Sequence, residues 1–274
     1  MTDGAVMRLT VIGSSGSFPG PSSAASCYLV EVDDAERDRP WRVVLDLGNG
    51  ALGPLQRFAG PGDLDAVLVS HLHPDHCMDL CGLYVALRYD PRVAAAAQRL
   101  PVHGPPGTLT RLVRAYGADD PADSPAGHDP VPAAMDAVYD VREWTDGVAV
   151  RIGPLTVIPR RVRHPVPTFG LRLEVAGRVL TYSADTDDCE ALGELAEGAD
   201  VFLCEASFVE GRDEVAGVHL TGRRAGAIAA RAGVGQLVLT HIPPWTDPAV
   251  VVAEARQVWS GPLDLAVPGA LFDV

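Results

Sequence analysis

The 274-residue sequence contains no lysine, so all 22 of its basic residues are arginines. The 36 acidic residues outnumber them and give a formal net charge of −14. A protein that grips a long nucleic acid presents a basic face that displaces counterions from the phosphates. The acidic balance therefore disfavours a large nucleic acid as a partner.

The sequence also lacks long apolar runs and is poor in aromatic residues. Aromatic residues make up only 6% of the chain, yet hydrophobic residues as a whole make up 47%. That hydrophobic content suffices for a sizeable core and is unlike the low hydrophobicity of disordered chains. No apolar run reaches the roughly 18 residues that span a bilayer, so no membrane association is expected.

Cysteines are few and do not form CxxC pairs. The five are Cys27, Cys77, Cys81, Cys189 and Cys204. An odd, scattered set predicts a reduced protein and not a disulfide framework. The first ten residues lack the long apolar segment of a secretion signal. Together these features predict a cytoplasmic location.

The order of apolar and turn-forming residues predicts an α/β protein. Strands are expected at 8–13, 27–32, 42–47, 66–70, 149–152, 155–159, 170–175, 178–183, 201–204 and 236–240, and helices at 78–89, 190–197, 221–232 and 248–259. Residues 104–136 are rich in Pro, Asp, Gly and Ala around a short helix at 108–116, which is typical of either a lid or a disordered loop. No linker splits the chain, so we expect a single domain, 1–274, of two sheets covered by helices.

The densest polar cluster, SHLHPDH, lies at the end of the predicted strand 66–70. His71 and His73 are two positions apart and share a face in extended chain. Asp75 and His76 follow where the chain turns into a helix, so they can face two neighbouring centres. Imidazole and carboxylate groups suit zinc, manganese or iron. The alternative is a polar turn with incidental histidines, but only eight histidines occur in the chain.

Three more potential ligands follow predicted strands farther along the chain. They are His164 in RVRHPVPTFG, Asp185 in TYSADTDD and His241 in LVLTHIPP. Each alone is equally compatible with a hydrogen-bonded loop residue. In this order, and together with the HLHPDH run, they predict a site for two metal ions.

These motifs resemble those of the metallo-β-lactamase superfamily, in the branch that contains ribonuclease Z and cyclic-nucleotide phosphodiesterases. The similar segments are GSSGSFPG, HLHPDH, HPVPTFG, YSADT, CEASF, VHLTG and LTHIPP, and they cover nearly the whole chain. The resemblance implies an αββα sandwich of two mixed sheets flanked by helices. It also implies two divalent metal ions, zinc or manganese, with iron as a further option. One would be held by His71, His73 and His164, the other by Asp75, His76 and His241, with Asp185 as the bridge.

The resemblance further implies three catalytic side chains. His219, in VHLTG, matches a histidine that ribonuclease Z-like enzymes place near the scissile phosphate, and Glu205, in CEASF, matches the carboxylate that orients it. Asp75 could accept a proton from the attacking water in addition to binding metal. For His219 the alternative is a loop residue before a helix that is capped by Thr221.

Two loop segments beside these motifs have weaker support. The glycine-rich segment 13–20 could present backbone N–H groups to a phosphate, although such loops are commonly simple turns. Asp46 and Asn49, in LDLGNG, follow a strand that approaches the site in the family, so Asp46 is expected to orient a ligand histidine.

Four other polar residues are not assigned to the site. His103 and His128 have no ligand-like surroundings and are interpreted as ordinary surface or loop residues. Cys77 and Cys81 lie four positions apart beside the metal run, and without further cysteines at ligand spacing they are interpreted as core residues.

The predicted substrate is a small phosphodiester. Ribonuclease Z usually carries a tRNA-holding arm between its third and fourth ligand motifs, but here only a predicted strand pair separates His164 from Asp185. The whole-chain pattern, especially LTHIPPWT and FLCEAS, is most similar to the cyclic-AMP phosphodiesterases of actinobacterial type. We therefore expect hydrolysis of 3′,5′-cyclic nucleotides to 5′-monophosphates. The alternatives are a ribonuclease Z-like endonuclease and a hydrolase of a non-phosphate ester or thioester. The family also implies a homodimer.

Overall fold

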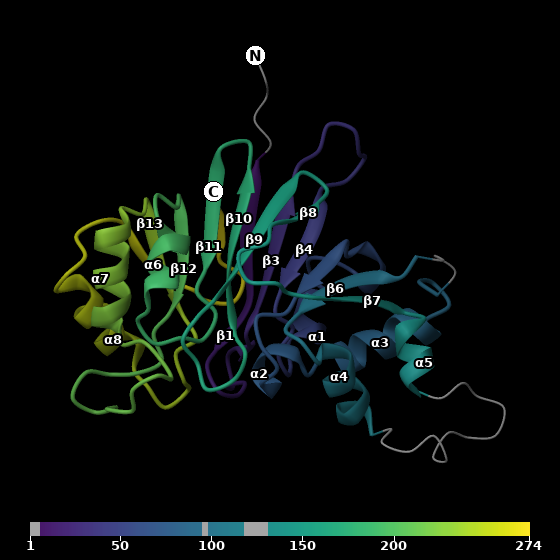
Figure 1. Ribbon diagram of the computed structural model, residues 1–274, viewed down its shortest axis with the longest axis horizontal. Coiled ribbons are helices and arrows are strands. Elements are labelled where there is room, and N and C mark those ends of the chain that lie inside the picture. The colour runs from purple at the N-terminus through teal and green to yellow at the C-terminus, as the bar shows by residue number, and fades with distance from the viewer. Residues whose placement is uncertain (1–5, 95–97, 118–130) are drawn as a thin grey trace.

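Two β-sheets lie face to face at the centre of the computed structural model, which describes residues 6–94, 98–117 and 131–274 (Figure 1). The first sheet, with β2 (Ala24–Ala25) paired to its strand β1, has the order β15 (Leu271–Asp273), β1 (Met7–Ser15), β3 (Cys27–Val32), β4 (Trp41–Leu45), β5 (Ala66–Leu68), β6 (Leu100–Gly104) and β7 (Tyr139–Glu143). The second sheet has the order β14 (Leu263–Leu265), β13 (Gln236–Thr240), β12 (Val201–Glu205), β11 (Arg178–Tyr182), β10 (Phe169–Val175), β9 (Leu155–Arg161) and β8 (Val150–Ile152).

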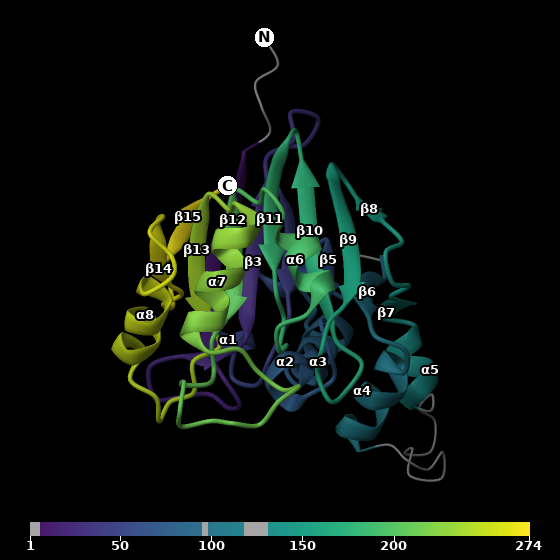
Figure 2. The same ribbon diagram turned by 60° about the vertical axis from the view of Figure 1, so that its left-hand side comes forward.

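Helices cover the outer face of each sheet (Figures 1 and 2). Those on the first sheet are α1 (Leu52–Leu55), α2 (Pro74–Cys77), α3 (Leu80–Tyr89), α4 (Thr108–Tyr116) and α5 (Val131–Asp136), with a 3₁₀ turn at Pro61–Asp63. Those on the second are α6 (Glu190–Ala196), α7 (Gly222–Ala232) and α8 (Pro248–Arg256). Both sheets mix parallel and antiparallel pairs, so the predicted αββα metallo-β-lactamase sandwich is confirmed. No described helix is long and apolar enough to cross a membrane.

The strands are buried on both faces because each sheet lies between its neighbour and a layer of helices. Along β3, Tyr28 and Val30 face the space between the sheets, whereas Leu29 packs under the helices of the first sheet. The hydroxyl of Tyr28 forms a 2.6 Å hydrogen bond with Thr240 of the second sheet. Continuous apolar strands of this kind are expected where both faces of a sheet are covered.

All ten predicted strands are present, each with its ends within two residues of the prediction. The sequence analysis missed several elements in the described residues, chiefly β6, β7 and α5. The mixed composition of β6, which includes Pro101 and His103, hides its position between β5 and β7. The segment 104–136, interpreted as a loop, contains α4 as predicted and also α5. Residues 118–130 of this segment, for which a lid and a disordered loop were the alternatives, lie outside the described part of the chain.

The interpretation of His103 as a surface or loop residue is wrong. Its side chain is buried in the first sheet and stacks on Trp144 with ring centroids 5.0 Å apart. His128, the other histidine set aside with it, lies outside the described residues. Cys77 and Cys81 were both interpreted as core residues. Cys77 is buried among apolar residues, as predicted, and Cys81 is half-buried.

A tight hairpin fills the interval between His164 and Asp185. Strands β10 and β11 are joined by Ala176 and Gly177, whose φ angles are +50° and +81°. Two consecutive positive φ values are typical of the type I′ turn that suits a two-residue hairpin. The predicted strand pair is therefore present, and this fully described interval contains no protruding arm.

Candidate metal centre

The candidate ligands gather at one edge of the two sheets. Strands β11, β12 and β13 run parallel, so Asp185, Glu205 and His241 come at or just beyond their carboxyl ends at the same edge. The run that begins at His71 follows β5 of the facing sheet. Segments far apart in the sequence thus meet where the strands of both sheets end.

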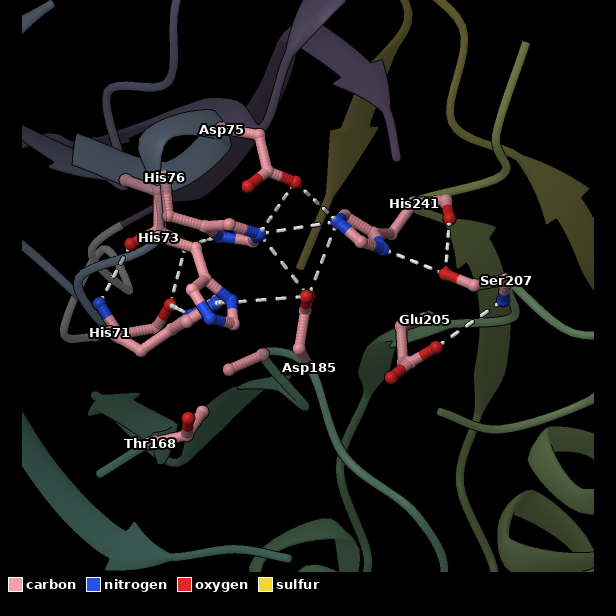
Figure 3. Close-up of polar contacts among 12 residues, drawn as sticks. His71, His73, Asp75, His76, Thr168, Asp185, Glu205, Ser207 and His241 are labelled. Atoms are coloured by element: carbon pink, nitrogen blue, oxygen red, sulfur yellow. Dashed lines mark hydrogen bonds and ion pairs between the residues drawn. The ribbon is translucent and has the colours of Figure 1, made fainter. Parts of the chain in front are cut away.

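The clustered side chains form two groups of potential metal ligands that share Asp185 (Figure 3). The first group is His71, His73, His164 and Asp185, and the second is Asp75, His76, Asp185 and His241. Within each group the ligand atoms lie within 4.8 Å of one another. The structure therefore brings together all seven residues that the sequence analysis singled out as metal ligands.

The two carboxylate oxygens of Asp185 face different groups. Its Oδ1 lies 3.3 Å from Nε2 of His76 and 3.4 Å from Nε2 of His241, whereas its Oδ2 lies 3.7 Å from Nε2 of His71. Oδ1 is buried but accepts no hydrogen bond from any described residue. A buried, unpaired carboxylate oxygen is costly in a folded protein, and a cation between these atoms would compensate it.

Hydrogen bonds to Nδ1 of His76 and of His71 determine which ring nitrogens carry a proton. Nδ1 of His76 lies 2.7 Å from Asp46 Oδ2, an acceptor, so Nδ1 donates. The Ser70 hydroxyl donates to the same Asp46 oxygen at 2.7 Å, which leaves the Ser70 oxygen to accept from Nδ1 of His71 at 3.1 Å. A neutral imidazole carries one N–H, so Nε2 of both rings presents a lone pair to the centre.

The same arrangement holds for His164 and His241. Nδ1 of His164 donates to the carbonyl oxygen of Val218 at 2.9 Å. The Ser207 hydroxyl donates to the His241 carbonyl at 2.6 Å and so accepts from Nδ1 of that ring at 2.7 Å. His73 differs in that its Nδ1 points inward, 3.0 Å from Nε2 of His71. Five imidazole lone pairs therefore converge with two carboxylates, which is a donor set that fits divalent metal ions.

Unusual backbone conformations hold several of these residues in place. Asp46, Ala184 and His241 have φ angles of +55°, +54° and +57°, in the left-handed region that residues other than glycine seldom adopt. Asp46 is the hydrogen-bond partner of His76, Ala184 directly precedes Asp185, and His241 is itself a proposed ligand. Such strain is typical of functional sites, where the surrounding structure enforces it.

The buried carboxylate of Glu205 orients His219 beside the two ligand groups. Oε1 lies 2.9 Å from Nδ1 of His219 and accepts from the amide of Thr186 at 2.6 Å. The His219 ring is 5.4 Å from that of His164 and 5.5 Å from that of His241, between centroids. It therefore lies beside both metal-ligand groups with its Nε2 free of this pairing.

The surrounding charges shift the pKa values of these side chains in different directions. Burial by itself would raise the pKa of Asp75, but the neighbouring His241 and His76 lower it well below its usual range. Burial lowers the pKa of His71 and of His164, which favours their neutral, metal-binding form. Burial would also lower the pKa of His219, but the Glu205 carboxylate raises it to about 9.

Comparisons with known proteins agree with this geometry. The family model described as "Beta-lactamase superfamily domain" matches residues 41–242. The chain belongs to the metallo-β-lactamase superfamily. It is a metallo-hydrolase of that fold, with a His/Asp cluster suited to divalent metals.

Three relatives of this metallo-hydrolase represent the range of its similarity. The uncharacterized protein ML1173 of Mycobacterium leprae is 46% identical over 269 residues, covering 98% of this chain and 89% of that protein. Ribonuclease Z of Mycobacterium marinum is 32% identical over 277 residues, covering 93% and 91%. The crystal structure of the metallo-β-lactamase fold protein YhfI from Bacillus subtilis has a TM-score of 0.82 at 25% identity, covering 98% and 100%.

The sequence analysis predicted one supporting residue of this metallo-β-lactamase site and missed others. Asp46 contacts ligand His76, as expected from its place after a strand. The contacts of Ser70, Ser207 and Tyr182 were missed, although Ser70 and Ser207 stand within the quoted motifs. Tyr182 donates to Asp46 at 2.8 Å across 136 positions of sequence, and no local pattern indicates such a contact.

Proposed function

We propose that the protein is a metal-dependent phosphodiesterase that uses two divalent ions to hydrolyse 3′,5′-cyclic nucleotides, cAMP first, to 5′-monophosphates. The observation that carries the proposal is the pair of ligand groups that share Asp185 and lie beside the Glu205–His219 pair. When bound, two such ions activate a water molecule and stabilise the charge that develops on phosphoryl oxygens.

The side chains of this chain supply the remaining steps. His71, His73 and His164 would hold one ion, Asp75, His76 and His241 the other, and Asp185 both. The ionised carboxylate of Asp75 can accept a proton from the attacking water. His219 can then donate a proton to the leaving ribose oxygen, since Glu205 keeps the imidazolium aimed at the centre.

The choice of a small substrate is supported by the surroundings of the site. The short β10–β11 hairpin occupies the interval in which ribonuclease Z usually carries its tRNA-holding arm. The net charge of −14 disfavours a long polyanion. The 32% identity to a ribonuclease Z is the observation in favour of the second candidate, an endonuclease acting on tRNA 3′ ends or small RNA.

A substrate panel tests the proposal. Purified protein loaded with manganese or zinc is offered cAMP, cGMP, bis(p-nitrophenyl) phosphate, a tRNA precursor and a thioester, and the products are identified by chromatography. Formation of 5′-AMP from cAMP is expected. Trimming of the tRNA precursor without turnover of cyclic nucleotides would favour the second candidate, and thioester cleavage alone would overturn both.

The assembly and location of the protein complete the proposal. We expect a homodimer, which light scattering after gel filtration would test. A cytoplasmic location is supported by the five cysteines, all of them free thiols in the described structure.

A further inference from the structure

Two exposed aromatic side chains, Phe18 and Trp245, lie against each other on loops that follow β1 and β13. Their ring centroids are 5.5 Å apart, and the rings are inclined by 38°. Phe18 is 46% exposed and Trp245 is 61% exposed. Aromatic residues make up only 6% of this chain, and a solvent-exposed apolar pair is typical of a binding surface.

The backbone joins the loop of Phe18 directly to the ligand His241. Ser15 forms a parallel β-bridge with Ile242, and the amide of Gly16 donates to the Ile242 carbonyl at 3.2 Å. A Cβ atom on Gly16 would lie only 2.3 Å from the His241 carbonyl oxygen, so only glycine permits this approach. Phe18 is two residues beyond this contact, within about 7 Å of chain.

Local hydrogen bonds fix the loop that presents Phe18. The amide of Phe18 donates to the Gly16 carbonyl at 2.8 Å, and the Ser15 hydroxyl donates to the Phe18 carbonyl at 2.7 Å. Phe18 therefore lies on backbone that is already ordered, which reduces the entropy lost when a ligand binds.

The loop of Trp245 is similarly restrained. Trp245 follows Pro243 and Pro244, and the amide of Thr246 donates to the Pro243 carbonyl at 2.9 Å. The Thr246 hydroxyl also accepts from Arg212 at 3.0 Å. Trp245 stands only four residues after His241, so the backbone that carries each ring is held close to the second ligand group.

We propose that the Phe18–Trp245 pair is the platform on which the base of a nucleotide stacks while its phosphate lies at the metal centre. This inference rests on the proposed phosphodiesterase function, and it adds that the enzyme prefers nucleotides to phosphodiesters without a base. Every nucleobase has a π face, so stacking accepts several bases without hydrogen bonds to any of them. The broad, exposed rings provide such a face, and their link to His241 places it within reach of a phosphate bound there.

Substitutions in the pair separate this role from a general effect on activity. The variants are Phe18→Leu, Trp245→Leu and their combination, with Phe58→Leu as a control at another exposed aromatic residue. The substrates are cAMP and the cyclic phosphate of propane-1,3-diol, which has the same six-membered ring without a base. We expect the ratio of kcat/KM for cAMP to that for the base-free diester to fall about 10- to 100-fold in the pair variants, mainly through KM. The Phe58→Leu ratio should match wild type.

A binding measurement keeps the inference testable if cAMP proves not to be the substrate. Calorimetric titration of manganese-loaded protein with 5′-AMP and with ribose 5-phosphate should show that the variants lose affinity for the nucleotide and much less for the sugar phosphate. That result would support the platform even if cyclic-nucleotide turnover were absent. Equal losses for both ligands, or no binding of 5′-AMP to wild type, would overturn it. So would conversion of a wild-type dimer to monomers by Trp245→Leu, which would identify the pair as a subunit contact.

Discussion

Oδ2 of Asp46 lies 2.7 Å from Nδ1 of His76 in a space that is closed to solvent. Asp46 also accepts hydrogen bonds from the amide and hydroxyl of Ser70 and from the hydroxyl of Tyr182. It therefore connects the histidine run that follows β5 to Tyr182 at the end of β11, three residues before Asp185. A single carboxylate thus orients His76 directly and reaches His71 through Ser70.

Replacing Asp46 with asparagine should weaken metal binding about 10- to 100-fold, as is typical when the partner of a ligand histidine is changed. Asparagine has one accepting oxygen and an NH2 group that only donates, so it cannot accept from the Ser70 amide on one side and from His76 on the other. Metal affinity is measured by competition with a chromophoric chelator. Tyr182→Phe removes a bond to the same carboxylate without touching an imidazole, and a smaller loss is expected. Unchanged affinity in Asp46→Asn would contradict the proposed role.

The sharing of Asp185 predicts different metal contents for three variants. His73 belongs only to the first ligand group and Asp75 only to the second, so His73→Ala and Asp75→Asn should each retain about one equivalent of metal per chain. Asp185→Asn should lower occupancy in both groups. Elemental analysis after dialysis gives the content, and His103→Gln, outside both groups, should match wild type. Retention of full occupancy in Asp185→Asn would show that this carboxylate is not a bridge.

The clustering of the seven proposed ligands could be predicted from sequence because each follows a strand in a short, distinctive motif. The clustering of His71, His73, Asp75 and His76 within six residues needs no tertiary information, and the downstream ligands complete it. The strand and helix pattern predicted two sheets covered by helices, and the αββα arrangement was implied by the resemblance to the metallo-β-lactamase superfamily.

The remaining features depend on contacts between distant segments. No local pattern shows that the Val218 carbonyl fixes the tautomer of His164 or that Tyr182 meets Asp46. Strand β6 was missed because Pro101 and His103 interrupt its apolar pattern, although its neighbours bury it on both sides. Tertiary packing outweighs local composition at such positions.

Replacing His219 should slow catalysis according to how much the leaving group needs a proton. His219→Asn is expected to lower kcat for cAMP about 10²- to 10⁴-fold, because a ribose alkoxide is a poor leaving group without a general acid. The loss for bis(p-nitrophenyl) phosphate should be much smaller, since p-nitrophenolate leaves readily as an anion.

Metal content distinguishes this catalytic role from a role in ligation. His219 lies outside the two proposed ligand groups, so His219→Asn should retain the metal content of wild type. Glu205→Gln should show the same dependence on leaving group to a lesser degree, because the imidazole remains but is less firmly oriented. Equal losses on both substrates would indicate that His219 is not the proton donor.

Burial of His103 should make the stability of the protein depend on pH below neutrality. Burial, and secondarily the charge of Arg142, lower the pKa of His103 to about 4, although Asp140 opposes the shift. The folded state thus holds a neutral imidazole that the unfolded chain protonates near its usual pKa of about 6.5. The neutral imidazole therefore contributes at most about 3 kcal/mol to the free energy of unfolding. This contribution is fully present above pH 6.5 and is lost as the pH falls towards 4.

Substitution of His103 with glutamine isolates this contribution from the other acid-titrating groups. The free energy of unfolding is measured by urea titration of chelator-treated protein between pH 4 and 7. Wild type should lose more stability on acidification than His103→Gln does, because glutamine does not titrate. Arg142→Gln should retain most of the wild-type dependence, since burial is the larger cause of the shift. Parallel curves for wild type and His103→Gln would mean that the imidazole is protonated in the folded protein as readily as in the unfolded chain.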